Sequence, residues 1–325
     1  MPGLATELRQ LIEGETKSTR RHKVLIKWLQ KKILLRRRMR CKECKHKMKF
    51  RESVCVDNYA WICKHHSHKG RKLKRSVRHK SIFSKSKVSL FNWMRFLYRF
   101  AQGLRLRQVD MISDDISGSS ATLSKMARKL RDVCTTAMDK YQQARGQYIG
   151  GQEQFVTVDE SHFRHKRKYG RGRMAGGWKR KKWVFGMLGV DRRGRRHAKP
   201  ILRLVERRRR RDLVPLIAHH VKVGSTIISD EWRAYHNALP ELGYTHFTVN
   251  HSVSYVDAQT GAHTQHIERA WRTVKENVWR LRGNRTEELL LDHVRVIEWH
   301  EWLGRQHRKG PLGRVIHDIA VMYGH

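Results

Sequence analysis

The sequence contains no long apolar run and few acidic residues for a chain of 325. No stretch approaches the roughly 20 consecutive apolar residues that a membrane-spanning helix needs, and no apolar signal-peptide core follows the first residues. A membrane-spanning or secreted protein is therefore not expected. We expect an intracellular protein without a membrane partner.

Negative charge is scarce: 29 Asp and Glu stand against 71 Lys and Arg, for a formal net charge of +42 at pH 7. A compact domain with this charge repels itself unless a polyanion screens it. Nucleic acid is the natural partner, because each phosphate that is neutralised releases condensed counterions and adds affinity. At about 150 residues per domain, the length suggests two domains.

Cysteine is also scarce, and its count of five is odd. Four of the five lie within 23 positions beside several histidines, which in a reducing compartment indicates metal ligation rather than disulfides. A Cys-x2-Cys pair, a gap of 18 residues and a Cys-Lys-His-His-Ser-His run are typical of a zinc ribbon, although buried free cysteines and histidines that face nucleic acid remain the alternative. The expected zinc ligands are Cys41, Cys44, Cys63 and His68, with His66 or His65 as alternatives to His68 and no evident role for Cys55.

The first 142 residues divide into three predicted modules. Residues 1–40 contain a helical stretch at 24–35 and the run Arg36–Arg40, which indicates a basic arm with a nuclear-import signal or, equally, an ordinary helix with a solvated basic face. Residues 41–85 are the zinc-ribbon module. Residues 86–142 predict a helix-turn-helix DNA-binding region, with helices at 88–101, 104–112 and 119–138. Its expected recognition helix, at 120–131, carries Lys125 and Arg128 on a basic face, although three short helices also occur in proteins that bind no DNA.

Residues 150–310 predict an α/β domain. Strands are expected at 155–158, 183–190, 201–205, 225–229 and 245–250, and helices at 213–221, 232–239 and 264–282. In the last helix, apolar residues recur at intervals that form one stripe. An antiparallel run followed by alternating strands and helices is the order expected of a ribonuclease-H-like fold.

Three carboxylates stand where such a fold could bring them together. Asp159 ends the first strand, Asp230 ends the fourth, and Glu268 lies near the start of the last helix. Phosphoryl transfer on DNA needs such a cluster, because Mg²⁺ prefers oxygen ligands and two ions can hold the attacking and leaving oxygens. Lys275, two turns after Glu268, could reach a phosphate. Taken singly, each carboxylate has a structural alternative: a strand end, a helix N-cap and an exposed ion pair.

The residues around these carboxylates resemble the transposases of Merlin elements and their bacterial insertion-sequence relatives. The resemblance covers roughly residues 154–282, in order. This sequence departs from the family where a histidine replaces the usual second-knuckle cysteine. Some bacterial relatives use asparagine as the third catalytic residue, and Gln265 lies one turn before Glu268. The blocks that carry the resemblance are 158–163, 167–173, 183–186, 224–230, 249–252, 261–265 and 267–275.

The resemblance implies a nuclease and strand transferase that cuts transposon ends and joins their 3′ ends to target DNA. Asp159, Asp230 and Glu268 would be its metal ligands for two Mg²⁺ or Mn²⁺ ions, with Lys275 as the downstream basic residue. Pairing two ends favours a homo-oligomer, and the place of action would be the nucleus of a eukaryote or otherwise DNA in the cytoplasm.

The basic, glycine-containing segment 164–182 predicts a loop that grips phosphates, with a solvated charge run as the alternative. The DNA-binding residues expected there are Arg167, Lys168, Arg171, Arg173 and Lys181.

Two other functions remain open at this point. A nuclease or integrase on the same fold would share the carboxylates but lack strand transfer. A DNA-binding regulator descended from a transposase would keep the zinc ribbon and helices without catalysis, although three intact carboxylates disfavour it.

Overall fold

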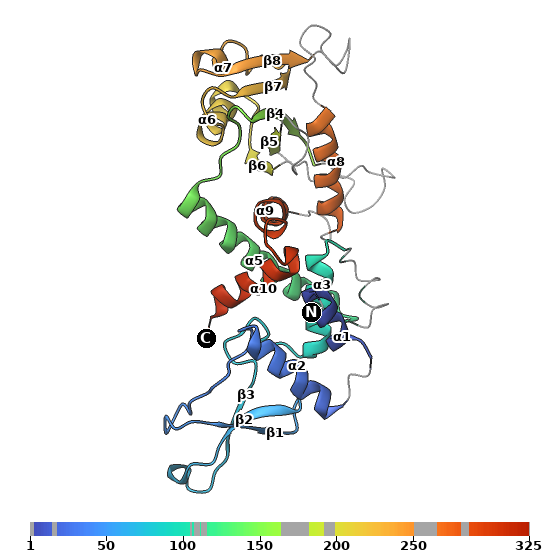
Figure 1. Ribbon diagram of the computed structural model, residues 1–325, viewed down its shortest axis with the longest axis vertical. Coiled ribbons are helices and arrows are strands. Elements are labelled where there is room, and N and C mark those ends of the chain that lie inside the picture. The colour runs from blue at the N-terminus through green and yellow to red at the C-terminus, as the bar shows by residue number, and fades with distance from the viewer. Residues whose placement is uncertain are drawn as a thin grey trace. The chain divides into compact units, whose positions relative to one another are not determined.

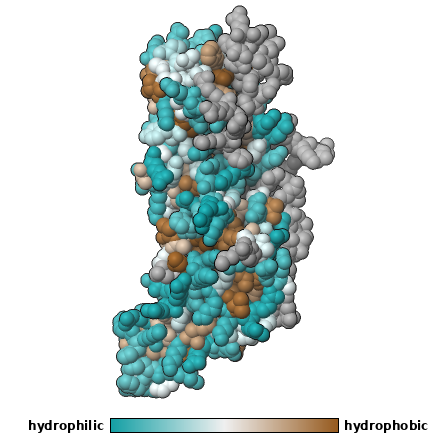
Figure 2. Space-filling view, viewed as in Figure 1, coloured by the Kyte–Doolittle hydropathy of each residue, from teal (hydrophilic) through white to brown (hydrophobic). Residues whose placement is uncertain are grey.

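The computed structural model describes residues 3–14, 18–104, 106, 111, 116–163, 182–191, 199–249, 265–280 and 286–324. The chain divides into two compact units, one of residues 1–136 with 304–325 and one of residues 137–303 (Figure 1). Helix α5 (Ser120–Arg145) runs from the first unit into the second. Among the described residues, no helix is long and apolar enough to cross a membrane. Hydrophilic residues cover most of the described surface that Figure 2 shows.

A small antiparallel sheet forms part of the first unit. Its strands β1 (Lys49–Glu52), β2 (Tyr59–Cys63) and β3 (Leu73–Ser76) lie in the order β1-β2-β3. The short helix η1 (His66–His68) lies in the connection between β2 and β3. The buried Arg78 donates a 2.7 Å hydrogen bond from Nε to Asp57 and further bonds to two backbone carbonyls. This ion pair fixes the loop before β2 to the segment after β3.

Among the described residues, the first unit also contains the start of α5 and four further helices: α1 (Leu4–Ile12), α2 (Thr19–Lys31), α3 (Leu90–Ala101) and α10 (Gly310–Tyr323). Helix α1 contacts α2, α3 and α10. Helix α3 begins where Ser89 accepts a hydrogen bond from the Asn92 N–H, and it buries an apolar face.

Part of the N-terminal segment that we expected to be a basic arm or an ordinary helix is helical and packed: α2 ends at Lys31, before the predicted end at residue 35, and the run Arg36–Arg40 is not helical. Leu25, Ile26 and Leu29 of α2 are fully buried, so this segment has the apolar face of an ordinary helix. Its role in DNA binding or nuclear import stays a prediction. Of the three predicted helix-turn-helix helices, the first is α3 and the third is the start of α5, whereas most of the second lies outside the described residues.

A five-stranded sheet is the centre of the second unit. The strands are β4 (Gln154–Ser161), β5 (Trp183–Asp191), β6 (Lys199–Val205), β7 (Thr226–Asp230) and β8 (Thr245–Val249), in the order β6-β5-β4-β7-β8. Strands β4, β5 and β6 pair antiparallel, and β4, β7 and β8 pair parallel. The first strand therefore lies at the centre, next to the fourth.

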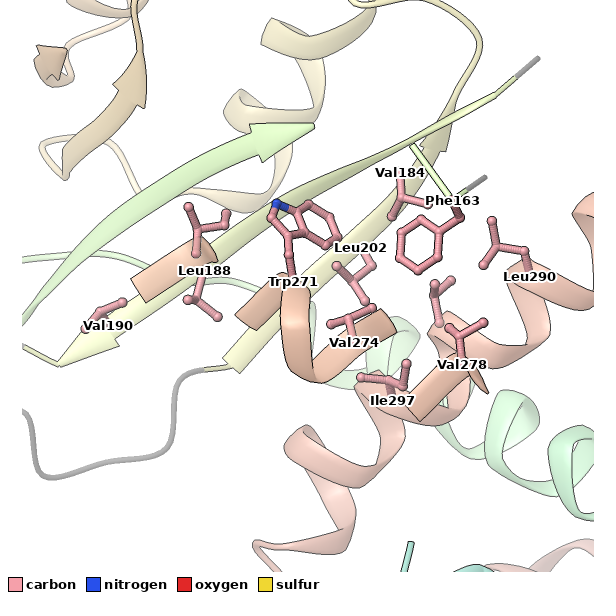
Figure 3. Packing of buried hydrophobic residues seen from close by; sticks show 12 residues of the cluster. Phe163, Val184, Leu188, Val190, Leu202, Trp271, Val274, Val278, Leu290 and Ile297 are labelled. Atoms are coloured by element: carbon pink, nitrogen blue, oxygen red, sulfur yellow. The ribbon is translucent and has the colours of Figure 1, made fainter. Parts of the chain in front are cut away.

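Helix α8 (Gln265–Arg280) and helix α9 (Glu287–Trp299) pack against each other, and their buried apolar residues join those of one face of the sheet. The cluster in Figure 3 brings Trp271 and Val274 of α8 against Val184 and Leu188 of β5. Successive strand residues point to opposite faces, so the buried Phe185 of β5 lies on the other face. Helix α6 (Arg210–His220) contacts β6, and the short α7 (Ala238–Glu241) contacts β8.

A buried carboxylate attaches α9 to the sheet edge. Glu298 is fully buried and accepts 2.8 Å hydrogen bonds from the Leu202 N–H and from Arg203, and a 2.9 Å bond from Arg295. Because an unpaired buried charge is strongly destabilising, these donors are needed for Glu298 to be buried.

The prediction of a helix at 232–239 is wrong. Residues 232–237 form turns, and only Ala238–Glu241 is helical. Asn237 has a left-handed φ of 57°, which a right-handed helix does not permit. Helices α9 and α10 were not predicted individually.

Candidate functional site

Four potential zinc ligands meet in the first unit. The atoms Cys41 Sγ, Cys44 Sγ, Cys63 Sγ and His68 Nε2 belong to one group within 4.8 Å, and the distances among them include 3.2, 3.4 and 3.5 Å. Around a tetrahedral Zn²⁺ with bonds of about 2.3 Å to sulfur and about 2.0 Å to nitrogen, neighbouring ligand atoms lie about 3.5 to 3.8 Å apart. The donor set and its spacing therefore fit one structural zinc ion.

Local structure explains how the four side chains converge. Cys41 and Cys44 lie on one tight turn, in which the Cys41 N–H bonds the His46 carbonyl at 2.9 Å. Cys63 ends β2, and His68 ends η1 five residues later. Glu43 Oε2 lies 3.4 Å from His68 Nδ1. A carboxylate on the outer ring nitrogen directs the inner nitrogen toward a metal, as in many zinc sites.

The electrostatics at Cys41 favour a thiolate. Burial raises the pKa of the Cys41 thiol, but the backbone N–H groups of Cys44 and Glu43 and the neighbouring thiols lower it to about 7. Thiolate is the form that binds metals.

The structure also separates His68 from the alternative fourth ligands. His66 is absent from both groups of three or more metal-ligating side chains found among the described residues, and His65 belongs to the second, with Cys44 and His46. Cys55 lies outside both groups, and its Sγ donates to the Tyr59 carbonyl at 3.3 Å.

Asp159, the first predicted catalytic residue, lies within the central strand β4 of the second unit. Its Oδ2 accepts a 2.8 Å hydrogen bond from Trp271 Nε1 of α8, and its Oδ1 accepts a 2.7 Å bond from the Glu160 N–H. The strand continues two residues beyond the predicted end, to Ser161.

Asp230, the second predicted catalytic residue, is the last residue of β7. The register of the parallel pair sets Thr157 opposite Ile228, and two residues further along the same strands stand Asp159 and Asp230. Asp230 Oδ1 accepts a 3.2 Å hydrogen bond from the Trp232 N–H. The two aspartates therefore occupy neighbouring positions at the carboxyl end of adjacent parallel strands.

Glu268 and Lys275 lie on α8, and both side chains are exposed. Glu268 stands one turn before Trp271, the residue that binds Asp159. Lys275 Nζ lies 5.9 Å from the ring centroid of Phe163, just beyond the end of β4. Helix α8 thus carries both residues along the side of the sheet on which Asp159 lies.

The three carboxylates do not form a group with all ligand oxygens within 4.8 Å. In the described part of the chain, both groups of three or more ligands at that spacing lie in the first unit. The assignment of Asp159, Asp230 and Glu268 as a shared metal site stays a prediction.

Glu160 is a site residue to which the sequence pattern assigned no role. Its side chain is buried, accepts a hydrogen bond from Tyr235 Oη and lies 3.6 Å from Arg208 Nη1. Burial, and then the charges of Asp159 and Asp230, raise the pKa of the Glu160 carboxyl to about 7, against the lowering effects of Tyr235 and Arg208. Negative charge is therefore concentrated where these two strands end.

Sequence reasoning missed Glu160 because it considered the strand-end position that Asp159 and Glu160 share, and not the face of the strand to which each side chain points. The alternation of strand β4 was the usable signal. Glu160 has the same parity as the apolar Val156 and Val158, so its side chain points to the same buried face.

The predicted DNA-binding residues fall into two sets. Lys125 and Arg128 are exposed on α5, on the side opposite the buried Leu123, Met126 and Leu130. The other set lies in the segment 164–181, outside the described residues: Arg167, Lys168, Arg171, Arg173 and Lys181.

Comparison with known proteins gives one family match. Residues 142–280 match the ISXO2-like transposase domain family, and this range runs from the end of α5 through β4 to α8. It therefore includes Asp159, Asp230, Glu268 and Lys275. No curated protein matches the chain. The match supports a transposase of the insertion-sequence type, and such a family implies DNA binding.

Proposed function

We propose that this protein is a DNA transposase, of the Merlin superfamily or the related insertion-sequence group, that binds the terminal inverted repeats of its element, cleaves there and joins the 3′ ends to target DNA. The observation that carries the proposal is the position of Asp159 beside Asp230 within a segment that matches a transposase domain family. Its homo-oligomeric state and its place of action, the nucleus of a eukaryote or otherwise DNA in the cytoplasm, are part of the same proposal.

The strand order supports a ribonuclease-H-like catalytic domain. Three antiparallel strands are followed by two parallel ones, and the first strand is central. In sheets with parallel strands, ligands commonly bind beyond the carboxyl ends, where the strand order reverses. Asp159 and Asp230 stand near those ends of β4 and β7.

Mg²⁺ or Mn²⁺ fits the side chains at this edge, because the candidate ligands are carboxylate oxygens and their charges already raise the pKa of Glu160. A bound pair of such ions would supply a nucleophile at neutral pH and would stabilise charge on the attacking and leaving oxygens. In this proposal Asp159 and Asp230 hold the ions, and Glu268 completes the ligand set from α8. Lys275 binds a phosphate of the DNA, and Trp271 orients Asp159 through its 2.8 Å hydrogen bond.

Strand transfer is the activity that tests the proposal. Purified protein is combined with a labelled duplex carrying the element's terminal repeat, a plasmid target and Mg²⁺ or Mn²⁺. We expect Asp159→Asn and Asp230→Asn to lower cleavage and joining by more than about 100-fold, because loss of even an outer partner of a metal ligand costs about 10- to 100-fold. The matched control is Glu206→Gln, an exposed carboxylate beyond β6.

Four outcomes separate the candidate functions and test the site assignment. Cleavage and joining that both depend on Asp230 support the transposase. Cleavage without a joined product would favour a nuclease on the same fold, and cleavage that survives Asp230→Asn would contradict the site assignment. Specific binding of the terminal repeat without cleavage would favour a regulator.

A further inference from the structure

An arginine is stacked between two tryptophans near the carboxyl end of β7. The Arg208 Cζ atom lies 4.3 Å from the ring centroid of Trp183, which begins β5, and 4.3 Å from that of Trp232, two residues after Asp230. Both distances are well within the range of cation–π attraction. We call Trp183, Arg208 and Trp232 the Trp-Arg-Trp stack.

Hydrogen bonds and an ion pair hold the stack in place. Arg208 Nη1 lies 3.6 Å from the buried Glu160 carboxylate, which itself accepts a hydrogen bond from Tyr235. Trp232 Nε1 donates a 2.8 Å hydrogen bond to the Arg208 carbonyl. Because the Arg208 guanidinium and the Trp232 indole are both held by these contacts, little side-chain conformational entropy is lost when a ligand binds.

The outer ring of the stack is open to solvent. Trp232 is 37% exposed. In contrast, Trp93 in the core of the first unit and Trp299 in the core of the second are each 1% exposed. A purely structural tryptophan would gain stability from burial. Trp232 instead contacts Arg208 in the stack and lies between Glu231 and Arg233 in sequence, and Arg207, Arg209 and Arg233 are exposed.

An exposed aromatic ring among arginines suits one class of ligand. Proteins that bind single-stranded nucleic acid use cationic side chains for the phosphates and aromatic rings for the bases, since every base has a face that can stack. A duplex offers no free base face, so the ring selects an unpaired nucleotide. The Trp232 N–H bonds Asp230 Oδ1 at 3.2 Å, which places the stack beside a proposed metal ligand.

We propose that the Trp-Arg-Trp stack, through the exposed face of Trp232, binds one unpaired nucleobase of DNA next to the phosphate that is cleaved. The position next to the cleaved phosphate rests on the proposed transposase function, whereas the binding of an unpaired base does not. Arg208 fixes the ring, and the neighbouring exposed arginines bind the adjoining phosphates.

Fluorescence of 2-aminopurine tests the base contact without any cleavage. The full chain, without added Mg²⁺ or Mn²⁺, is titrated into a duplex with a short single-stranded tail that carries 2-aminopurine, and into the blunt duplex with the same label. We expect quenching at one tail position and none in the blunt duplex. Trp232→Leu should abolish the quenching and weaken binding of the tailed duplex by about 5- to 150-fold, the range of one base stacked on one aromatic ring.

Matched variants separate stacking from charge and from folding. Trp232→Phe keeps an aromatic face and should retain most of the quenching, whereas Arg208→Lys keeps the charge, loses the planar contact and should reduce it. Leu242→Ala, at an apolar residue of similar exposure (42%) in the same unit, should leave quenching unchanged. Circular dichroism confirms that each variant is folded.

Quenching that persists in Trp232→Leu, or that is equal in blunt and tailed duplexes, overturns the base-stacking site. A chain that cleaves and joins DNA normally while showing no such quenching contradicts this inference alone. A chain that shows Trp232-dependent quenching but never cleaves contradicts the transposase function and still supports the site for an unpaired base.

Discussion

Several of the few acidic side chains in this basic protein are buried and paired. Asp57 binds Arg78, Glu298 binds Arg203 and Arg295, and Glu160 binds Tyr235. Carboxylates in a chain of net charge +42 therefore serve folding as well as the catalysis that we propose. The small number of acidic residues is therefore, by itself, a weak reason to assign catalysis to Asp159 and Asp230. The neighbouring positions of Asp159 and Asp230 in the sheet are what supports a catalytic role for these two residues.

Substitution of single residues among the four candidate zinc ligands tests the proposed metal site directly. We expect one equivalent of zinc in the purified protein, lost or bound at least about 10-fold more weakly in Cys41→Ser and His68→Ala, because each removes one of four ligands. The metal content is measured by elemental analysis after dialysis against a weak chelator.

The matched controls are Cys55→Ser and His66→Ala, which lie outside the four-ligand cluster. Both should retain a full equivalent of zinc. If His66→Ala loses the metal while His68→Ala keeps it, the assignment of the fourth ligand is wrong.

At the scale of secondary structure, the packing of α8 on the sheet depends on a glycine in β5. Gly186 pairs with Asp159 across β4 and β5, and a Cβ atom built on it would lie 2.6 Å from Trp271 Cζ2. Trp271 is the residue whose Nε1 binds Asp159. The absence of a side chain at Gly186 therefore lets α8 approach closely enough for that hydrogen bond.

Gly186→Ala should destabilise the second unit by about 1 to 3 kcal/mol, the usual cost of adding a methyl group to a packed core. Urea unfolding followed by fluorescence measures this change. In a Trp271→Leu background the same substitution should cost less, because the smaller side chain removes the clash and makes the two changes non-additive.

Gly118→Ala is the control for the added methyl group, since nothing lies within 4 Å of a Cβ at that position. Its effect should stay within about 0.5 kcal/mol, as for most exposed sites. An equal cost of Gly186→Ala in both backgrounds would show that Trp271 is not the residue that the added methyl group meets.

At the scale of the whole molecule, we expect net charge to govern the proposed association with DNA. With a formal charge of +42, binding to duplex DNA of unrelated sequence should fall by about 10³-fold or more between 50 and 200 mM salt, as expected for six or more phosphate contacts. Fluorescence anisotropy of a labelled duplex measures the affinity at each salt concentration.

If the exposed side of α5 faces DNA, Lys125→Ala and Arg128→Ala should each reduce the slope of log affinity against log salt by about one. A slope unchanged in both variants would remove α5 from the DNA-binding surface and leave the charge elsewhere in the chain to account for the affinity.

The sequence alone determined those properties that residues carry locally. Charge indicated a nucleic-acid partner, short apolar runs predicted all five strands of the larger sheet, and the stripe of α8 predicted its buried face. The spacing of Cys41, Cys44 and Cys63 located the group of potential zinc ligands. The predictions of the strands, of the buried face of α8 and of the cysteine ligands succeeded because hydrophobic periodicity and ligand spacing are properties of short segments, one or two turns or strands long.

Only the tertiary structure decided which distant residues meet. It selected His68 among three histidines, set Asp159 beside Asp230, and brought Trp183, Arg208 and Trp232 into one stack. A helix was predicted at 232–239 from the local spacing of apolar residues alone. The hydrogen bond from the Trp232 N–H to Asp230 and the left-handed backbone of Asn237 instead make residues 232–237 a turn. Each of these outcomes depends on strand pairing or packing between segments far apart in the chain, and no local pattern contains that information.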